Sequence, residues 1–305
     1  MTKTSYARRF LPFIAVASLA LSACGSSNPV ASASEAFRLN GVAYSIKDFD
    51  ALNEALIKVG QYPSENGTIS REDLAVTLAV LIRYQAYVDF AKANGLKETD
   101  EDRNAVNADA DADPNFASYP EALRETLLKL NVSDRVMERV TAPTLDELKK
   151  LYNKMPASAG VLCLSHILLE TEEEAREALK EVTSGTAFAE VAAAKSIEPG
   201  ASQSGGALKD GEEDCNALPS LQQSFDPDFM VGAIAAKPGV PTGPIKTQFG
   251  WHIILSHEFD DVKESAARVL AQNTGALLLA GHLATVNVSV NSKYGVWNGA
   301  TGRIS

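Results

Sequence analysis

Two short stretches, SHILL (residues 165–169) and GPIKTQFGWHII (residues 243–254), decide the fold of this chain. The first ends a continuous apolar run, VLCLSHILL, which predicts a buried strand. The second predicts a turn that leads into another apolar strand. Each predicted strand carries one histidine, His166 or His252, among apolar neighbours. The two strands are the first and last elements of one predicted domain.

The sequence between these strands predicts helices and one loop. A helix starts at Thr171, with three glutamates in its first turn, where negative charge is favourable to the helix dipole. Further helices are predicted at residues 186–195 and 226–236, and a glycine-rich loop at 200–206 separates them. A strand, three helices and a strand within about 100 residues are typical of a compact α+β domain.

The residues before this domain, 37–155, predict a mostly helical unit. An Asn-Gly pair at residues 40–41, between alternating apolar residues, is a hairpin signal. Capping residues and apolar stripes predict helices at these positions: 45–60, 70–95, from 99, 120–130, 133–139 and from 144. The stretch MPASAG (residues 155–160) marks the boundary with the domain that follows.

The residues after the domain are predicted to be helical from 259 to 283 and then to form a short strand at 286–290. This piece is too small to fold alone, so we expect it to pack on the first helical unit. The predicted segments are a signal peptide (1–23), a flexible tether (24–36), a helical N-terminal domain (37–157), the α+β domain (158–259) and the returning helix and strand (260–305).

The start of the chain resembles the export signal of a bacterial lipoprotein. Three basic residues precede an apolar run, residues 10–21, which is too short to be a comfortable membrane span. The run leads to Leu-Ser-Ala-Cys, and in such lipoproteins the cysteine, here Cys24, is cleaved free and receives lipid. This implies an extracytoplasmic, membrane-anchored protein of a bacterial cell envelope. An ordinary signal peptide is the alternative, and no other stretch is predicted to span a membrane.

Charge and cysteine content restrict the partners and the environment of the protein. The net charge is −11, and removal of residues 1–23 takes away three positive charges. An acidic chain argues against nucleic acid as a partner, because phosphate binding needs a basic face. Disulfides persist outside the cytoplasm, so Cys163 and Cys215 are predicted to pair, with two free buried thiols as the alternative.

Neither a metal site nor a hydrolase site is predicted. Asp109, Asp111 and Asp113 superficially resemble the start of a calcium loop, but Pro114 and Pro120 stand where that loop needs Gly and Glu. We therefore interpret this segment as a solvated acidic loop. No other ligand spacing and no nucleophile elbow is found, so no metal or cofactor is expected.

The domain at 158–259 resembles the parvulin family of peptidyl-prolyl isomerases. SHILL and GPIKTQFGWHII carry the resemblance, together with Phe188 and the Ser-Gly-Gly of residues 204–206. It implies a small antiparallel sheet with surrounding helices, beside a mostly helical, chaperone-like domain built from the N- and C-terminal segments. The whole layout is similar in outline to exported foldases of the PrsA/SurA type.

The resemblance implies cis–trans isomerisation of X–Pro bonds (EC 5.2.1.8) in unfolded or partly folded exported polypeptides, without a cofactor. Rotation about the peptide bond meets a barrier of about 18–20 kcal/mol, and no bond is broken. The site must hold the proline ring and favour the twisted amide over the planar one. Twisting removes resonance and leaves less charge on the oxygen, so an apolar, water-poor pocket favours the twisted form.

The resemblance also implies roles for individual residues. His166 and His252 face each other on neighbouring strands and organise a hydrogen-bond network, to which Thr247 adds a hydroxyl. The remaining roles are the aromatic floor of the proline pocket (Phe229), an apolar wall on the same helix face (Phe225), a variable rim position (Phe249) and a catalytic loop position that is often Cys or Asp (Glu198). The alternatives are structural histidines and plain core phenylalanines. His257 and His282 lie outside the motifs and are interpreted as ordinary.

The chain departs from the family pattern in one loop. Glu198 is one methylene longer than Asp, and residues 207–210 are ALKD, where the family usually has Asp-Leu-Gly-aromatic. The loop that follows is longer and holds Cys215, so the disulfide is expected to tie it to the first strand. These departures motivate a second hypothesis, a non-catalytic holdase chaperone with an idle parvulin domain.

Overall fold

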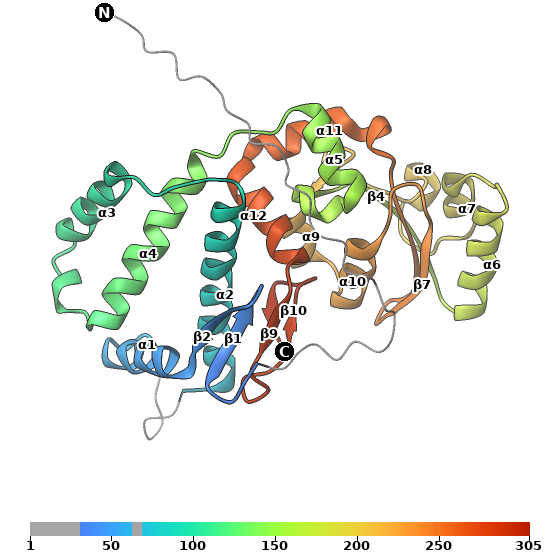
Figure 1. Cartoon of the computed structure of the whole chain (residues 1–305). Coiled ribbons are helices and arrows are strands. Elements are labelled where there is room, and N and C mark those ends of the chain that lie inside the picture. Colours follow the sequence, from blue (N-terminus) through green and yellow to red (C-terminus); the bar gives the residue numbers. More distant parts are fainter. Residues whose placement is uncertain (1–30, 63–68) are drawn as a thin grey trace, which may run out of the picture.

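The computed structural model describes residues 31–62 and 69–305 (Figure 1). The predicted signal peptide and the lipidation site Cys24 lie outside these residues. The described chain forms a helical body, to which both of its ends contribute, and a sheet-centred domain inserted between α5 and α11. In Figure 1 the inserted domain is the yellow and orange part of the ribbon.

Most helices of the body begin where the sequence predicted a helix start. They are α1 (Ile46–Lys58), α2 (Arg71–Ala93), α3 (Asp100–Ala112), α4 (Glu121–Glu138), α5 (Leu145–Lys154), α11 (Phe259–Gln272) and α12 (Thr274–Thr285), with short 3-10 turns η1 (Phe116–Ser118) and η2 (Pro156–Ala159). The side chains of Ser45, Ser70, Thr99 and Thr144 each accept a hydrogen bond from the backbone of the third helical residue. These caps satisfy backbone donors that a helix start leaves free.

A three-stranded antiparallel sheet joins the two ends of the chain. Its order is β2 (Val42–Ser45), β1 (Glu35–Leu39) and β9 (Val288–Val290). Phe37 of β1 pairs with Val290, and α12 packs on α2, where His282 Nε2 lies 2.9 Å from Asp89 Oδ2. A small hairpin of β10 (Trp297–Asn298) and β11 (Arg303–Ile304) follows. The C-terminal segment therefore completes the core of the N-terminal one.

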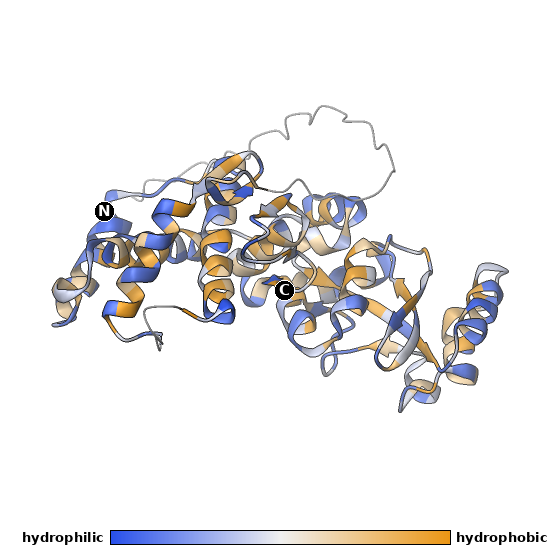
Figure 2. Ribbon diagram, turned by 90° about the horizontal axis from the view of Figure 1, so that it is seen from below, coloured by the Kyte–Doolittle hydropathy of each residue, from blue (hydrophilic) through white to orange (hydrophobic). Residues whose placement is uncertain are grey.

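Helix α2 is the central helix of the body. By length and composition it could cross a membrane, which the sequence analysis did not anticipate. In the structure, Leu78, Leu81, Ile82 and Phe90 of α2 are buried in the core of the body. Apolar and hydrophilic residues alternate around the helices in Figure 2, as expected for helices that bury one face. The apolar character of α2 therefore reflects its packing among other helices.

Three local expectations were wrong. The predicted tether extends to residue 36, but Glu35 already pairs in β1. The two helices predicted at 120–130 and 133–139 are one helix, α4, because no Gly or Pro interrupts it and the Ser133 hydroxyl donates back to Leu130 O (2.6 Å). The acidic segment at Asp109–Asp111 belongs to the last turn of α3 and is not a loop.

The inserted domain is built on a four-stranded antiparallel sheet with the order β5-β4-β8-β7. Its strands are β4 (Leu164–Leu169), β5 (Ala207–Leu208), β7 (Thr242–Thr247) and β8 (Gly250–Ser256), and β3 (Val161–Leu162) pairs separately with β6 (Asn216–Ala217). Its helices are α6 (Glu172–Thr183), α7 (Phe188–Lys195), α8 (Ala201–Ser204), α9 (Leu218–Ser224) and α10 (Pro227–Ala235). The expected small antiparallel sheet with surrounding helices is confirmed.

Strand alternation gives the sheet two different faces. One face packs against α6 and α7 and buries Ile167, Leu169 and Ile253. The other face packs against α10, which Figure 1 shows on the opposite side of β7 from α6. The second face carries both motif histidines.

A disulfide of the inserted domain and polar contacts beside it lie where that domain meets the body. Cys163, between β3 and β4, and Cys215, just before β6, form a disulfide within the core of the body. Glu213 in the long loop accepts hydrogen bonds from Arg268 (2.8 and 2.9 Å) and from the Ser265 hydroxyl (2.6 Å) of α11. The loop that departs from the family pattern is therefore held against a helix of the body.

Candidate active site

The two motif histidines lie side by side on one face of the sheet. Strands β4 and β8 are antiparallel, with His166 opposite Ile254 and His252 opposite Leu168, so the histidines are diagonal neighbours. The two Nδ1 atoms are 3.3 Å apart, and the rings are nearly parallel, with centroids 5.5 Å apart. Both side chains are buried, and the two rings are hydrogen-bond partners of each other.

Thr247, at the end of β7, extends this pair to a third polar group. Its Oγ1 lies 2.9 Å from His252 Nε2 and accepts a hydrogen bond from the Phe249 N–H (3.1 Å). In the described part of the chain, His252 Nε2 is the one acceptor within reach of the Thr247 hydroxyl, so we assign the hydroxyl proton to this bond. We therefore assign the His252 proton to Nδ1, where it is donated to His166 Nδ1, and the His166 proton to Nε2.

Both histidines are neutral near pH 7. Burial, together with a smaller effect of the neighbouring His252, lowers the pKa of His166 from 6.5 to about 4. Burial likewise lowers the pKa of His252 to about 4, although the carboxylate of Asp226 acts in the opposite direction. The low-dielectric surroundings disfavour the charged form of each histidine. The two rings can therefore hydrogen-bond to each other while neither carries a charge.

Two phenylalanine rings cover the histidines. The Phe229 ring lies 5.6 Å from the His166 ring and 5.2 Å from the His252 ring, in each case edge to face. The Phe225 ring stacks on Phe229 with centroids 4.8 Å apart. Phe229 is fully buried and Phe225 is half-buried, so the rings form a floor and a partly open wall.

The prediction that Phe225 and Phe229 share one helix face was wrong. Phe225 has an extended backbone after α9, and Phe229 lies in α10. Pro227 explains the break, because the residue before a proline avoids helical geometry, and Asp226 caps the new helix instead. The rings meet because the chain turns between the two helices.

Two other predicted site residues lie apart from this cluster. Phe249 is 64% exposed in the turn between β7 and β8, and only its backbone N–H contacts the network. Glu198 is half-buried after α7, and within the described part of the chain its carboxylate has no hydrogen bond to either histidine. The neighbouring Ser196 hydroxyl instead accepts hydrogen bonds from the backbone of Leu168 and Glu198.

The Ser-Gly-Gly motif supports the backbone of His166. Gly206 O accepts a hydrogen bond from His166 N (2.9 Å), and Gly206 N donates to Ser204 Oγ (3.1 Å). Gly206 has a φ of +81°, and a Cβ there would lie 2.3 Å from His166 O. Only glycine combines this conformation with such a close approach, so the motif fixes the position of the histidine strand.

The sequence analysis missed two polar contacts near the site. His257, interpreted as ordinary, lies with its Nε2 2.9 Å from Ser165 Oγ in the first motif. Asp226 accepts hydrogen bonds from the Asp228 N–H (2.9 Å) and from the Gln248 side chain (3.2 Å). An Asp directly before Pro at a helix start was the available signal for the second contact.

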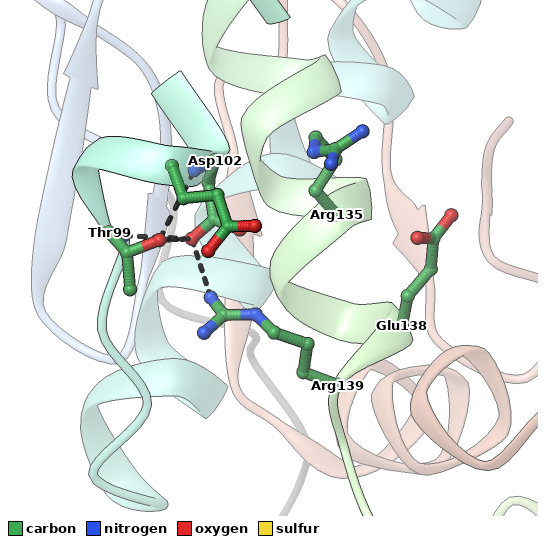
Figure 3. A pocket seen from close by; sticks show the side chains of 6 residues that line it. Thr99, Asp102, Arg135, Glu138 and Arg139 are labelled. Carbon is green, nitrogen blue, oxygen red and sulfur yellow. Dashed lines mark hydrogen bonds and ion pairs between the residues drawn. The ribbon is translucent and has the colours of Figure 1, made fainter. Parts of the chain in front are cut away.

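A separate cavity of about 180 Å³ lies in the body between α3 and α4 (Figure 3). Its lining residues are Thr99, Glu101, Asp102, Arg135, Glu138 and Arg139. The buried carboxylate of Asp102 is already held by Arg139, at 2.6 Å, and by the Thr99 hydroxyl and N–H. We interpret this cluster as a cap that joins α3 to α4. No group of three or more metal-ligating side chains is present among residues 31–62 and 69–305.

Comparisons with known proteins agree with the geometry of the inserted domain. Residues 166–258 match the family model "Rotamase", a PPIC-type PPIase domain. The foldase protein PrsA of Clostridium botulinum is 34% identical over 167 residues, 50% of this chain and 48% of that protein. PrsA of Clostridium kluyveri is 29% identical over 168 residues, 53% of this chain and 47% of that protein. The chain therefore spans about half the length of the curated relatives that it matches.

Two solved structures match this chain with low TM-scores. PrsA from Bacillus subtilis is 23% identical, with 68% of this chain and 80% of that chain covered and a TM-score of 0.30. A SurA-like chaperone structure from Campylobacter jejuni is 22% identical, with 78% and 90% covered and a TM-score of 0.27.

Proposed function

We propose that this chain, whose residues 166–258 are a PPIC-type peptidyl-prolyl isomerase domain, catalyses cis–trans isomerisation of X–Pro bonds in unfolded or partly folded polypeptides. The observation that carries the proposal is the buried, neutral pair His166 and His252 directly below the ring of Phe229. This arrangement offers an apolar floor for the proline ring and polar groups without net charge beside the amide.

The chemistry follows from the change in the amide as it twists. A planar amide carries more charge on its oxygen and is favoured by water, whereas the twisted amide is favoured where water is excluded. The rings of Phe225 and Phe229 exclude water from one side. The assigned hydrogen bonds run from Thr247 to His252 and from His252 to His166. The Nε2–H of His166 is not used in these bonds and is a neutral donor. It can interact with the amide as its charge distribution changes, so the site binds the transition state more tightly than the planar substrate.

A cis–trans peptide assay tests the proposal. The full chain with Cys24→Ser is compared with the same chain carrying Phe229→Ala or Val231→Ala. Val231 is 50% exposed on the same helix and serves as the matched control. We expect acceleration that Phe229→Ala removes and Val231→Ala keeps. A chain that accelerates no X–Pro peptide would refute the isomerase and leave the holdase hypothesis.

We further propose that the protein works outside the cytoplasm in a bacterial cell envelope, anchored to a membrane through lipid on Cys24. The Leu-Ser-Ala-Cys pattern after the apolar run supports this placement, as do relatives named as foldases. Metabolic labelling with a fatty acid tests it. The expected result is label on the intact chain and none on Cys24→Ala, which also leaves the membrane fraction. Label on both chains would contradict the assignment.

The helical body offers a surface on which an unfolded client can be held. Val76, Val80 and Val88 of α2 are 55%, 42% and 37% exposed, and their spacing of four and eight residues places them on one side of the helix. Unfolded polypeptides bind such apolar stripes because both partners lose water-exposed apolar area. Val80→Lys should weaken suppression of client aggregation, with Lys92→Ala on the same helix as the control. Unchanged suppression would exclude this surface.

A further inference from the structure

Asp226 occupies a central place at the rim of the proposed proline pocket. It lies in sequence between the two pocket rings, Phe225 and Phe229, which stack on each other. One carboxylate oxygen accepts from the Asp228 N–H and the other from the Gln248 side chain. Both donors are uncharged, so the negative charge of Asp226 is not neutralised by its partners.

The surrounding segments add no positive charge to this rim. Residues 217–235, which include α9 and α10, contain Asp226 and Asp228 but no Lys or Arg, and the turn at 247–250 contains no charged residue. In the part of the chain that the structure describes, no ion pair involves Asp226. The rim is therefore acidic, whereas the floor below it is apolar.

Lys246, the lysine beside the turn at 247–250, points away from the pocket. Lys246 precedes Thr247 in β7, and alternation places the two side chains on opposite faces of the sheet. The Lys246 Nζ lies over the Trp251 ring, 4.7 Å from its centroid, on the face that packs against α6. This cation–π contact holds the positive charge of Lys246 on the other side of the sheet from Asp226.

The charge of Asp226 acts on His252 in the proposed site. It raises the pKa of His252, although burial has the larger effect and lowers that pKa overall. The link is also geometric, because Gln248, which donates to Asp226, directly follows Thr247, which bonds His252. A charged side chain beside a bound proline would therefore interact with the Asp226 carboxylate.

We propose that Asp226 makes the pocket selective for X–Pro bonds flanked by a basic residue, Lys or Arg, over those flanked by an acidic residue. The inference rests on the proposed function, since it concerns the substrates of the same site. Attraction between partly exposed charges favours Lys–Pro, and repulsion disfavours Glu–Pro. By the magnitude of exposed charge pairs, the preference for Lys over Glu is roughly two- to five-fold.

A binding experiment tests the selectivity separately from catalysis. Isotope-labelled full chain with Cys24→Ser is titrated with peptides that differ only beside proline, having Lys, Ala or Glu on either side, and NMR shifts give each Kd. We expect tighter binding of the Lys peptide than of the Glu peptide. The preference should shrink in 0.5 M salt, because salt screens exposed charges.

Two variants identify the residue responsible. Asp226→Asn keeps one oxygen that can cap α10, and its NH2 group replaces the oxygen that accepts from Gln248, whose amide can turn to accept instead. This variant should bring the ratio of the two Kd values close to one. Asp226→Ser is a second capping variant with the same expected outcome if Asn disturbs the fold. Glu190→Gln removes one exposed charge from α7, on the opposite face of the sheet, and should leave the ratio unchanged.

The outcomes separate this inference from the isomerase proposal. Equal binding of Lys and Glu peptides, a preference unchanged by Asp226→Asn, or no binding of any peptide overturns the selectivity, whatever the catalytic rate. Absence of rate acceleration on all peptides, including Ala–Pro, refutes the isomerase alone. A Lys preference that Asp226→Asn abolishes supports the inference even in that case.

Discussion

Replacing Thr247 by valine tests the proton order of the site in the most direct way. Valine keeps the shape of the side chain but removes the hydroxyl that lies 2.9 Å from His252 Nε2 and accepts from Phe249 N. His252 Nε2 then has no described donor, and nothing holds the His252 proton on Nδ1. The hydrogen bond to His166 Nδ1 loses its fixed direction, although both histidines remain.

The size of the effect follows from one buried hydrogen bond. Such a bond contributes about 1 kcal/mol net, so it favours one proton arrangement over the other about five-fold. Without this bond the two arrangements become about equally populated, so the competent fraction falls from about five-sixths to about one half, and we expect kcat for an X–Pro peptide to fall roughly two-fold. The free energy of unfolding should fall by about 1–3 kcal/mol, because Thr247 is buried and two groups lose their partner.

Ring nitrogen NMR of the two histidines measures the proton positions, and a cis–trans assay measures the rate. Thr247→Ser restores the hydroxyl and should restore both the nitrogen shifts and most of kcat, which a merely structural role of the methyl group would not do. Nitrogen shifts that are the same in the wild type and in Thr247→Val, with an unchanged kcat, would refute the assigned proton order.

Three further predictions concern pH, the glycine motif and the disulfide. The pKa values of His166 and His252 fall from 6.5 to about 4 on folding, so the unfolded chain binds more protons than the folded chain between these pH values. The contribution of the two histidines to stability is therefore complete above pH 6.5 and is lost as the pH falls toward 4. Urea titrations at pH 7.5 and 4.5 should show this difference in the free energy of unfolding, and His252→Gln should reduce the difference. Gly206→Ala should destabilise the domain and lower activity, because its Cβ would meet His166 O at 2.3 Å, and thermal unfolding would detect this; an unchanged melting temperature would contradict the close approach. Reduction of the Cys163–Cys215 bond, which spans 52 residues, should lower the free energy of unfolding by about 4 kcal/mol on the chain-entropy model, and a reduced protein as stable as the oxidised one would argue against it.

The sequence patterns that were interpreted correctly are those in which a short segment carries its own physical signal. Capping residues such as Ser70 and Thr144 identified helix starts, because a side-chain oxygen satisfies a nearby backbone donor. The Asn-Gly pair identified the first hairpin, in which both residues adopt positive φ. The motifs around His166 and His252 predicted the paired strands, and residues 166–258, which contain both histidines, match the PPIC-type PPIase family model.

Other features could not be derived from local sequence, because they depend on contacts between distant segments. The spacing of Phe225 and Phe229 suggested one helix, yet their rings meet across a turn that Pro227 imposes. His257 seemed unrelated to the motifs, but it follows β8 and reaches Ser165 on β4. Spacing along a chain suggests which residues share an element, but a break such as Pro227 overrides it, and spacing does not show which elements meet.

The sequence by itself predicted an acidic chain with a helical unit and an inserted domain that carries two motif histidines and matches the PPIC-type PPIase family model. Tertiary structure alone decided the chemistry within the site. It buried the histidine pair and thereby kept it neutral, added the Thr247 hydroxyl at one end, and separated Asp226 from Lys246 by a sheet. The physical reason is that propensity and patterning act over a few residues, whereas desolvation and electrostatic interaction depend on which surfaces pack together in space.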